Sequence, residues 1–120
     1  MNQLFSNLFI NSLKFFKPGE PLKIKIDFKI LSQQEVADLN LPDLHDQYIK
    51  IIFSDNGIGF EQQYAQQIFR LFTRLHGKAE YEGTGIGLGL CKKIVQNHNG
   101  LIWAESEPGK GADFIIVLPL

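Results

Sequence analysis

A glycine-rich stretch that runs directly into a helical pattern constrains this chain most. The stretch GTGIGLGL, residues 83–90, has glycine at Gly83, Gly85, Gly87 and Gly89, and its last leucine opens the amphipathic run LCKKIVQNHNG. Each glycine loses more backbone entropy on folding than another residue would, so this much bare backbone needs a reason. Free amides and the positive dipole end of a helix form an anion site that glycine lets a phosphate approach closely. The stretch therefore predicts a phosphate-binding segment, with a flexible hinge as the alternative.

Two common phosphate-binding loops do not match this stretch. A dinucleotide fingerprint needs G-x-G-x-x-G directly after a strand, but Leu88 and Leu90 stand where the third glycine could fall, and the preceding HGKAEYE is polar. A P-loop ends in Gly-Lys-Ser/Thr, whereas this one ends in Gly89, Leu90 and Cys91. Another kind of phosphate site is required.

Size, charge and cysteine content narrow the class of protein. The 120 residues carry a formal net charge of −1 and are 44% hydrophobic, which fits one globular domain over residues 1–120. This charge gives no electrostatic reason to expect contact with nucleic acid or a membrane. No apolar run approaches the ~20 residues of a membrane span. The lone Cys91 cannot form an internal disulfide, and these features together favour a cytoplasmic location.

Hydrophobic periodicity predicts both helices and strands. Apolar residues recur every three or four positions in the expected helices and alternate with polar ones in the first expected strand. Residues 32–47 are polar and contain a proline, which indicates a surface excursion. Helices on one side of a mixed, mostly antiparallel sheet make an α+β fold, a two-layer sandwich. The expected helices span residues 2–16, 61–75 and 90–98, and the expected strands span 22–30, 48–54, 101–106 and 112–118.

The first expected helix carries a polar stripe. Gln3, Asn7, Asn11 and Lys14 are spaced four, four and three residues apart and share one face, while the rest of the helix is apolar nearly all round. Buried amides need hydrogen-bond partners. An asparagine oxygen can ligate a hard cation such as Mg²⁺, and a lysine can meet phosphate as a point charge. An exposed polar face is the alternative interpretation of the same spacing.

The motif DNGIGF follows the second expected strand and places Asp55 beside a Gly-x-Gly turn. A carboxylate held at a strand end can accept a hydrogen bond from an exocyclic amine, while Gly57 and Gly59 leave space for a flat ring. Taken alone, the motif favours an ordinary Asx-type turn over a binding site.

Taken in order, these segments resemble the ATP-binding catalytic domain of sensor histidine kinases, within the wider group that includes gyrase, Hsp90 and MutL. QLFSNLFINSLKF is similar to the N box, DNGIGF to the G1 box, IFRLFTRLH to the F box and GTGIGLGL to the G2 box. GLIWAESEPGKGADFIIVLP resembles the terminal strands of that domain. The resemblance covers nearly all of the chain except residues 32–47, and it implies the Bergerat ATP-binding fold.

The resemblance implies ATP and Mg²⁺ as ligands and assigns roles to the matching residues. Asn11 would coordinate Mg²⁺, Asn7 and Lys14 would act at the phosphates as catalytic residues, and Asp55 would bind the adenine amine. Phe69, like Phe72, would help to anchor the lid that closes over ATP, and packing in the core is an equally open and compatible role for both. The remaining positions of the adenine floor and the lid would be Gly57, Ile58, Gly59, Phe72, Gly83, Thr84, Gly85, Ile86, Gly87 and Leu88.

The chain departs from the family pattern at its front and near its end. It begins inside the N box, and the dimerisation domain that carries the phospho-accepting histidine is missing, so we expect an N-terminally truncated catalytic domain. Ala112 stands where a serine or threonine often follows Gly111. His45, His76 and His98 lie outside any acceptor-like helix, and we predict that none of them is the acceptor.

The implied activity is transfer of the γ-phosphoryl group of ATP to a histidine of that separate dimerisation domain, and from there to the receiver domain of a response regulator. An ATPase is one alternative, but its general base would be a glutamate at the position of Asn7. A serine-kinase anti-sigma factor and a degenerate nucleotide-sensing scaffold are the others. The F box and G2 sequences argue against the anti-sigma factor, and the intact N, G1 and G2 positions argue against the degenerate scaffold.

Overall fold

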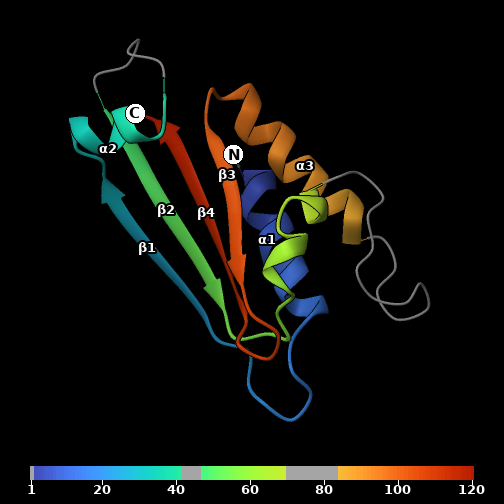
Figure 1. Cartoon of the computed structure of the whole chain (residues 1–120). Coiled ribbons are helices and arrows are strands. Elements are labelled where there is room, and N and C mark those ends of the chain that lie inside the picture. Colours follow the sequence, from blue (N-terminus) through green and yellow to red (C-terminus); the bar gives the residue numbers. More distant parts are fainter. Residues whose placement is uncertain (1, 42–46, 70–83) are drawn as a thin grey trace.

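A four-stranded sheet forms one layer of the domain, as the computed structural model of residues 2–41, 47–69 and 84–120 shows (Figure 1). The strands are β1 (Ile24–Ile30), β2 (Tyr48–Asp55), β3 (Leu101–Ser106) and β4 (Ala112–Pro119). Their order in the sheet is β1-β2-β4-β3, and every pairing among them is antiparallel.

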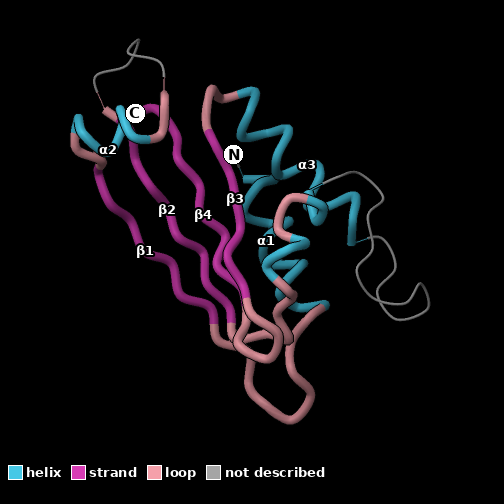
Figure 2. The backbone as a smooth tube through the Cα atoms, in the orientation of Figure 1, coloured by secondary structure: helices cyan, strands magenta, loops and turns pink. Residues whose placement is uncertain are grey.

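Helices form the second layer on one face of this sheet (Figure 2). They are α1 (Asn2–Lys14) and α3 (Thr84–Asn97), which pack against each other, together with the 3₁₀ turns η1 (Gln62–Tyr64) and η2 (Gln67–Phe69). The α+β two-layer sandwich predicted from the sequence is therefore confirmed. None of the helices in the described ranges is long and apolar enough to cross a membrane.

The main core lies between the sheet and the two long helices. Leu4 and Leu8 of α1 and Val95 of α3 are fully buried there against Phe53 of β2. Phe69 packs edge-to-face on Phe114, with ring centroids 6.2 Å apart. Apolar side chains that alternate along the central strands thus meet apolar stripes on the helices, which is the arrangement that buries both.

Cys91 belongs to this core. Its side chain is fully buried on α3, and burial raises the pKa of the thiol to about 12. Its Sγ lies 3.8 Å from the carbonyl oxygen of Leu4. The cysteine is therefore a small neutral core residue at physiological pH.

The surface excursion contains a helix that periodicity did not predict, α2 (Gln33–Asp38). Ser32 caps it: its Oγ accepts from the backbone N–H of Glu35, and the Glu35 carboxylate accepts from the backbone N–H of Ser32. Hydrogen bonds from Lys29 Nζ and then from the Ser32 backbone lower the pKa of Glu35 to about 2. The Ser-x-x-Glu capping box was visible in the sequence and explains this helix.

The helix expected over residues 61–75 is not continuous. In its described part, residues 61–69, the chain forms only the two 3₁₀ turns, and the remainder lies outside the described residues. Gln62 makes two hydrogen bonds to the backbone of β3 here. Its Nε2 donates to the carbonyl oxygen of Ala104 at 3.1 Å, and its Oε1 accepts from the N–H of Ser106 at 2.8 Å. These tertiary bonds hold the first turn against the sheet, and they override the helical periodicity.

The last helix begins earlier than the glycine content suggested. α3 starts at Thr84, so Gly85, Gly87 and Gly89 lie inside the helix and not in a loop before it. At its other end Asn99 adopts a left-handed conformation with φ of 61°, and the N–H of Gly100 bonds the carbonyl oxygen of Val95 at 2.9 Å. Asn99 and Gly100 thus form the C-cap of α3.

Candidate functional site

Two buried amide atoms on α1 have no hydrogen-bond partner among the described residues: Nδ2 of Asn7 and Oδ1 of Asn11. Asn11 is 9% exposed, and Asn7, one turn earlier on the same face, is half-buried. The outer members of the predicted stripe, Gln3 and Lys14, are exposed. Buried polar atoms normally find partners, because leaving one unpaired costs about 1–3 kcal/mol. The unpaired donor and acceptor therefore point to a ligand.

Asp55 lies at the end of β2 and is held by two hydrogen bonds. Its Oδ2 accepts from Oγ of Ser12 at 2.9 Å, and its Oδ1 accepts from the backbone N–H of Gly57 at 2.9 Å. Ser12, which is fully buried on α1, was not among the predicted site residues. Its only signal in the sequence was a small polar residue directly after Asn11.

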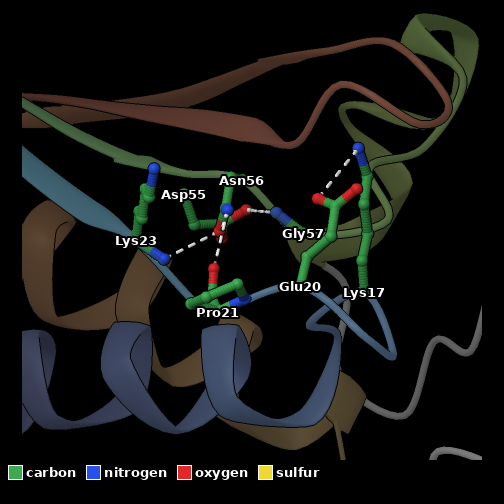
Figure 3. A network of polar contacts seen from close by, with 7 residues as sticks. All are labelled: Lys17, Glu20, Pro21, Lys23, Asp55, Asn56 and Gly57. Carbon is green, nitrogen blue, oxygen red and sulfur yellow. Dashed lines mark hydrogen bonds and ion pairs between the residues drawn. The ribbon is translucent and has the colours of Figure 1, made fainter.

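The turn after Asp55 is bound to the end of α1 and the connection that follows it. The N–H of Ile58 donates to the carbonyl oxygen of Phe15 at 2.8 Å. Asn56 makes two hydrogen bonds to that connection (Figure 3). Its Nδ2 donates to the carbonyl oxygen of Pro21 at 2.9 Å, and its Oδ1 accepts from the N–H of Lys23 at 2.8 Å. The DNGIGF turn and the end of α1 thus form one rigid corner.

The hairpin between β3 and β4 closes this corner from the other side. The N–H of Gly109 bonds the carbonyl oxygen of Ile58 at 2.7 Å. A β-carbon on Gly59 would overlap the carbonyl oxygen of Glu107, and Gly59 has a φ of 69°. A β-carbon on Gly57 would crowd the carbonyl oxygen of Phe15. Both glycines are thus needed for close packing of the backbone. This role is independent of the space that they were expected to leave for the flat ring of a base.

The start of α3 lies at the same end of the helix layer as the end of α1, because the two helices run in opposite directions (Figure 1). The backbone of Thr84, Gly85, Ile86 and Gly87 forms the first turn of α3, whose amides have no partner within the helix. Leu88 is 5% exposed and packs in the main core, so its side chain is not available to a ligand. Phe72 and Gly83 lie outside the described residues.

Comparison with known proteins assigns the family. Residues 1–120, the whole chain, match the family described as "Histidine kinase-, DNA gyrase B-, and HSP90-like ATPase". The chain belongs to this family. The Bergerat fold implied by the sequence is confirmed by likeness to the catalytic domain of the histidine kinase ThkA. The TM-score is 0.67, with 26% identity over 98% of this chain and 64% of that one. The mycobacterial sensor histidine kinase MprB shares the fold, with a TM-score of 0.65 and 21% identity over 98% of this chain and 68% of that one.

Curated relatives of this domain include a phytochrome-like protein and a sensor protein. The phytochrome-like protein Cph1 of Synechocystis sp. is 40% identical over 118 residues, and the sensor protein SrrB of Staphylococcus aureus is 37% identical over 124 residues. These alignments cover 98% and 99% of the chain, but only 14% and 18% of the two relatives. The chain therefore spans less than a fifth of either relative.

Proposed function

We propose that this domain binds Mg·ATP and donates its γ-phosphoryl group to a histidine on a separate dimerisation domain, as the catalytic part of a two-component sensor kinase. The observation that carries the proposal is the pair of unpartnered amide atoms, Asn7 Nδ2 and Asn11 Oδ1, buried one turn apart on α1. They offer one donor and one acceptor on the helix that also contacts Asp55 through Ser12, and α3 begins at the same end of the helix layer as α1 ends.

The phosphate end of the site would be built by α1 and α3. Asn11 Oδ1 is a hard oxygen acceptor without a described partner, and oxygen ligands of this kind suit Mg²⁺. When bound, Mg²⁺ would neutralise charge on the phosphates. Asn7 Nδ2 can only donate a hydrogen bond, and thus suits a phosphate oxygen and not the role of a general base. Lys14, in the last turn of α1, and the amides at the start of α3 would add positive potential.

The base end of the site would be built around Asp55. Its ionised carboxylate can only accept hydrogen bonds, which matches the exocyclic amine of adenine. Each oxygen has a second acceptor position beyond the bonds from Ser12 and Gly57. The backbone of Gly57, Ile58 and Gly59 would form the floor, because it is fixed against α1 and the hairpin.

The kinase activity rests on the relatives. SrrB is named a sensor protein, and ThkA, at 26% identity, is named a histidine kinase. Phosphoryl transfer depends mainly on positioning and on electrostatic stabilisation, so a domain without a general base can perform it when a partner supplies the nucleophile. The partners would be the dimerisation domain and, after it, the receiver domain of a response regulator. A reaction that consumes ATP would take place in the cytoplasm.

Asn11→Ala is expected to weaken Mg·ATP binding by about tenfold or more while changing adenosine binding less than twofold, because Asn11 faces the metal and not the base. Isothermal calorimetry with ATP, with and without Mg²⁺, and with adenosine measures both. Gln3→Ala removes an exposed amide from the same stripe and should change neither. An equal loss for Mg·ATP and adenosine would mean that Asn11 has only a structural role.

Asp55→Asn is expected to weaken ATP binding by roughly 5- to 100-fold in a folded protein, since a mispaired buried group costs about 1–3 kcal/mol. The N–H of Gly57 requires an oxygen, so the new amide group must turn its NH₂ toward Ser12 and the amine of the base. Asp113→Asn, on the opposite face of the sheet, makes the same change in net charge and serves as the control. Unchanged ATP affinity in folded Asp55→Asn would remove Asp55 from the site.

A further inference from the structure

A hydroxyl group from α1 controls the carboxylate at the end of β2. Ser12 and Asp55 are 43 residues apart in the sequence, yet Oγ lies 2.9 Å from Oδ2, and Ser12 is fully buried. Ala112 lies directly opposite Asp55 in the β2–β4 ladder and offers no hydroxyl. Among the described residues, the side-chain donor to Asp55 therefore comes from the helix.

The directions of the two hydrogen bonds to Asp55 are determined by chemistry. A backbone N–H can only donate, so Oδ1 of Asp55 must act as the acceptor toward Gly57. An ionised carboxylate can only accept, so Ser12 must use its single hydrogen toward Oδ2. Rotation of the carboxylate out of its plane would break both bonds at once. The pair thus holds the group in one orientation, with both oxygens as acceptors.

We propose that Ser12 is a positioning residue for Asp55. The Ser12–Asp55 pair would make the site select a purine whose group facing Asp55 is an amine over one that has a carbonyl at the same position. This inference rests on the proposed function. A purine amine donates to the held carboxylate, whereas the carbonyl oxygen of guanine would face another acceptor. Without the Ser12 bond the carboxylate can turn, and the discrimination between the two groups falls.

The test compares three triphosphates on the folded 120-residue chain and on Ser12→Ala. ATP carries the amine, GTP carries a carbonyl there, and purine riboside triphosphate carries neither group. Ser12→Ala should lower the affinity for ATP about tenfold, as loss of a hydrogen bond to a charged group does. It should lower the preference for ATP over GTP by a similar factor. Binding of purine riboside triphosphate should change less than twofold.

Two further variants separate positioning from packing. Ser6→Ala makes the same substitution at an exposed position of α1 and should leave all three affinities unchanged. Ser12→Thr keeps a hydroxyl and should keep the preference for ATP. In an Asp55→Asn background, Ser12→Ala should have little additional effect on ATP, because the group that it positions has already been altered.

The outcomes are distinct. Equal weakening of all three triphosphates by Ser12→Ala, or loss of the ATP preference in Ser12→Thr, would overturn the positioning role. ATP binding by the unaltered chain with no effect of Ser12→Ala would overturn this inference alone. Absence of any nucleotide binding by the unaltered chain would overturn the proposed function and this inference with it.

Discussion

On incubation with Mg·ATP, these 120 residues alone are expected to form almost no phosphohistidine, although they bind the nucleotide. Holding an acceptor imidazole in line with the γ-phosphate can be worth ~7–11 kcal/mol of barrier. His98 follows the far end of α3, about 20 Å from the first turn of that helix at 1.5 Å per residue. It cannot meet a phosphate bound at that first turn. His45 and His76 lie outside the described residues, and the sequence around them is not acceptor-like.

Radiolabelled ATP and acid lability of the label measure this result. Dimerisation helices of a sensor histidine kinase, added in trans, should restore labelling on a histidine of the added piece. The same helices with that histidine changed to glutamine should stay unlabelled. Acid-labile label on the 120-residue chain alone would contradict the prediction, and brisk ATP hydrolysis that disappears on Asn7→Ala would make the domain an ATPase instead.

Gly111→Ala is expected to destabilise the domain by about 4 kcal/mol or more, which is a large share of the roughly 5–15 kcal/mol that keeps a domain folded. Gly111 has a φ of 81°, and a β-carbon there would overlap the backbone carbonyl oxygen of Asp55. The strand ladder cannot relieve this clash cheaply, because Ala112 pairs directly with Asp55. Loss of stability and loss of the base end of the site should therefore coincide.

Gly109→Ala is the matched control for this change. Gly109 has nearly the same backbone conformation, with a φ of 80°, but a β-carbon there would meet nothing within 4 Å. Only the conformational cost of about 1–2 kcal/mol applies. Urea denaturation of both variants measures the difference, and equal losses would show that the overlap with Asp55 is relieved by backbone movement.

The strands and the order of the motifs were predictable because local spacing encodes them. The alternating LKIKIDFKI and the mostly apolar YIKIIFS predicted β1 and β2 within two residues at each end. The alternation did not predict that the apolar face of β1 is only partly covered. Phe28 is 65% exposed and Ile30 is 49% exposed, while Ile24 and Ile26 pack on the main core. Periodicity shows which residues share a face, but not what lies on it.

The helix boundaries were harder to predict where tertiary contacts compete with local propensity. Glycine weakens isolated helices, so the run from residue 83 looked like a loop before a helix. In the fold, α3 continues through those glycines, and Leu88 and Cys91 are buried in the core. The helical pattern from residue 61 failed for the opposite reason, since Gln62 is bonded to β3.

By itself, the sequence determined the fold class, because spacing within each segment predicts a helix or a strand and the order of the segments limits how they can pack. It also predicted the candidate phosphate and base residues, because their motifs are short and local. Only the tertiary structure decided how these segments serve one another. The bond from Ser12 to Asp55 and the fit of Gly111 against the Asp55 carbonyl join residues that are 43 and 56 positions apart. Such pairings depend on how α1 and the hairpin pack at the end of β2. No local period encodes that packing.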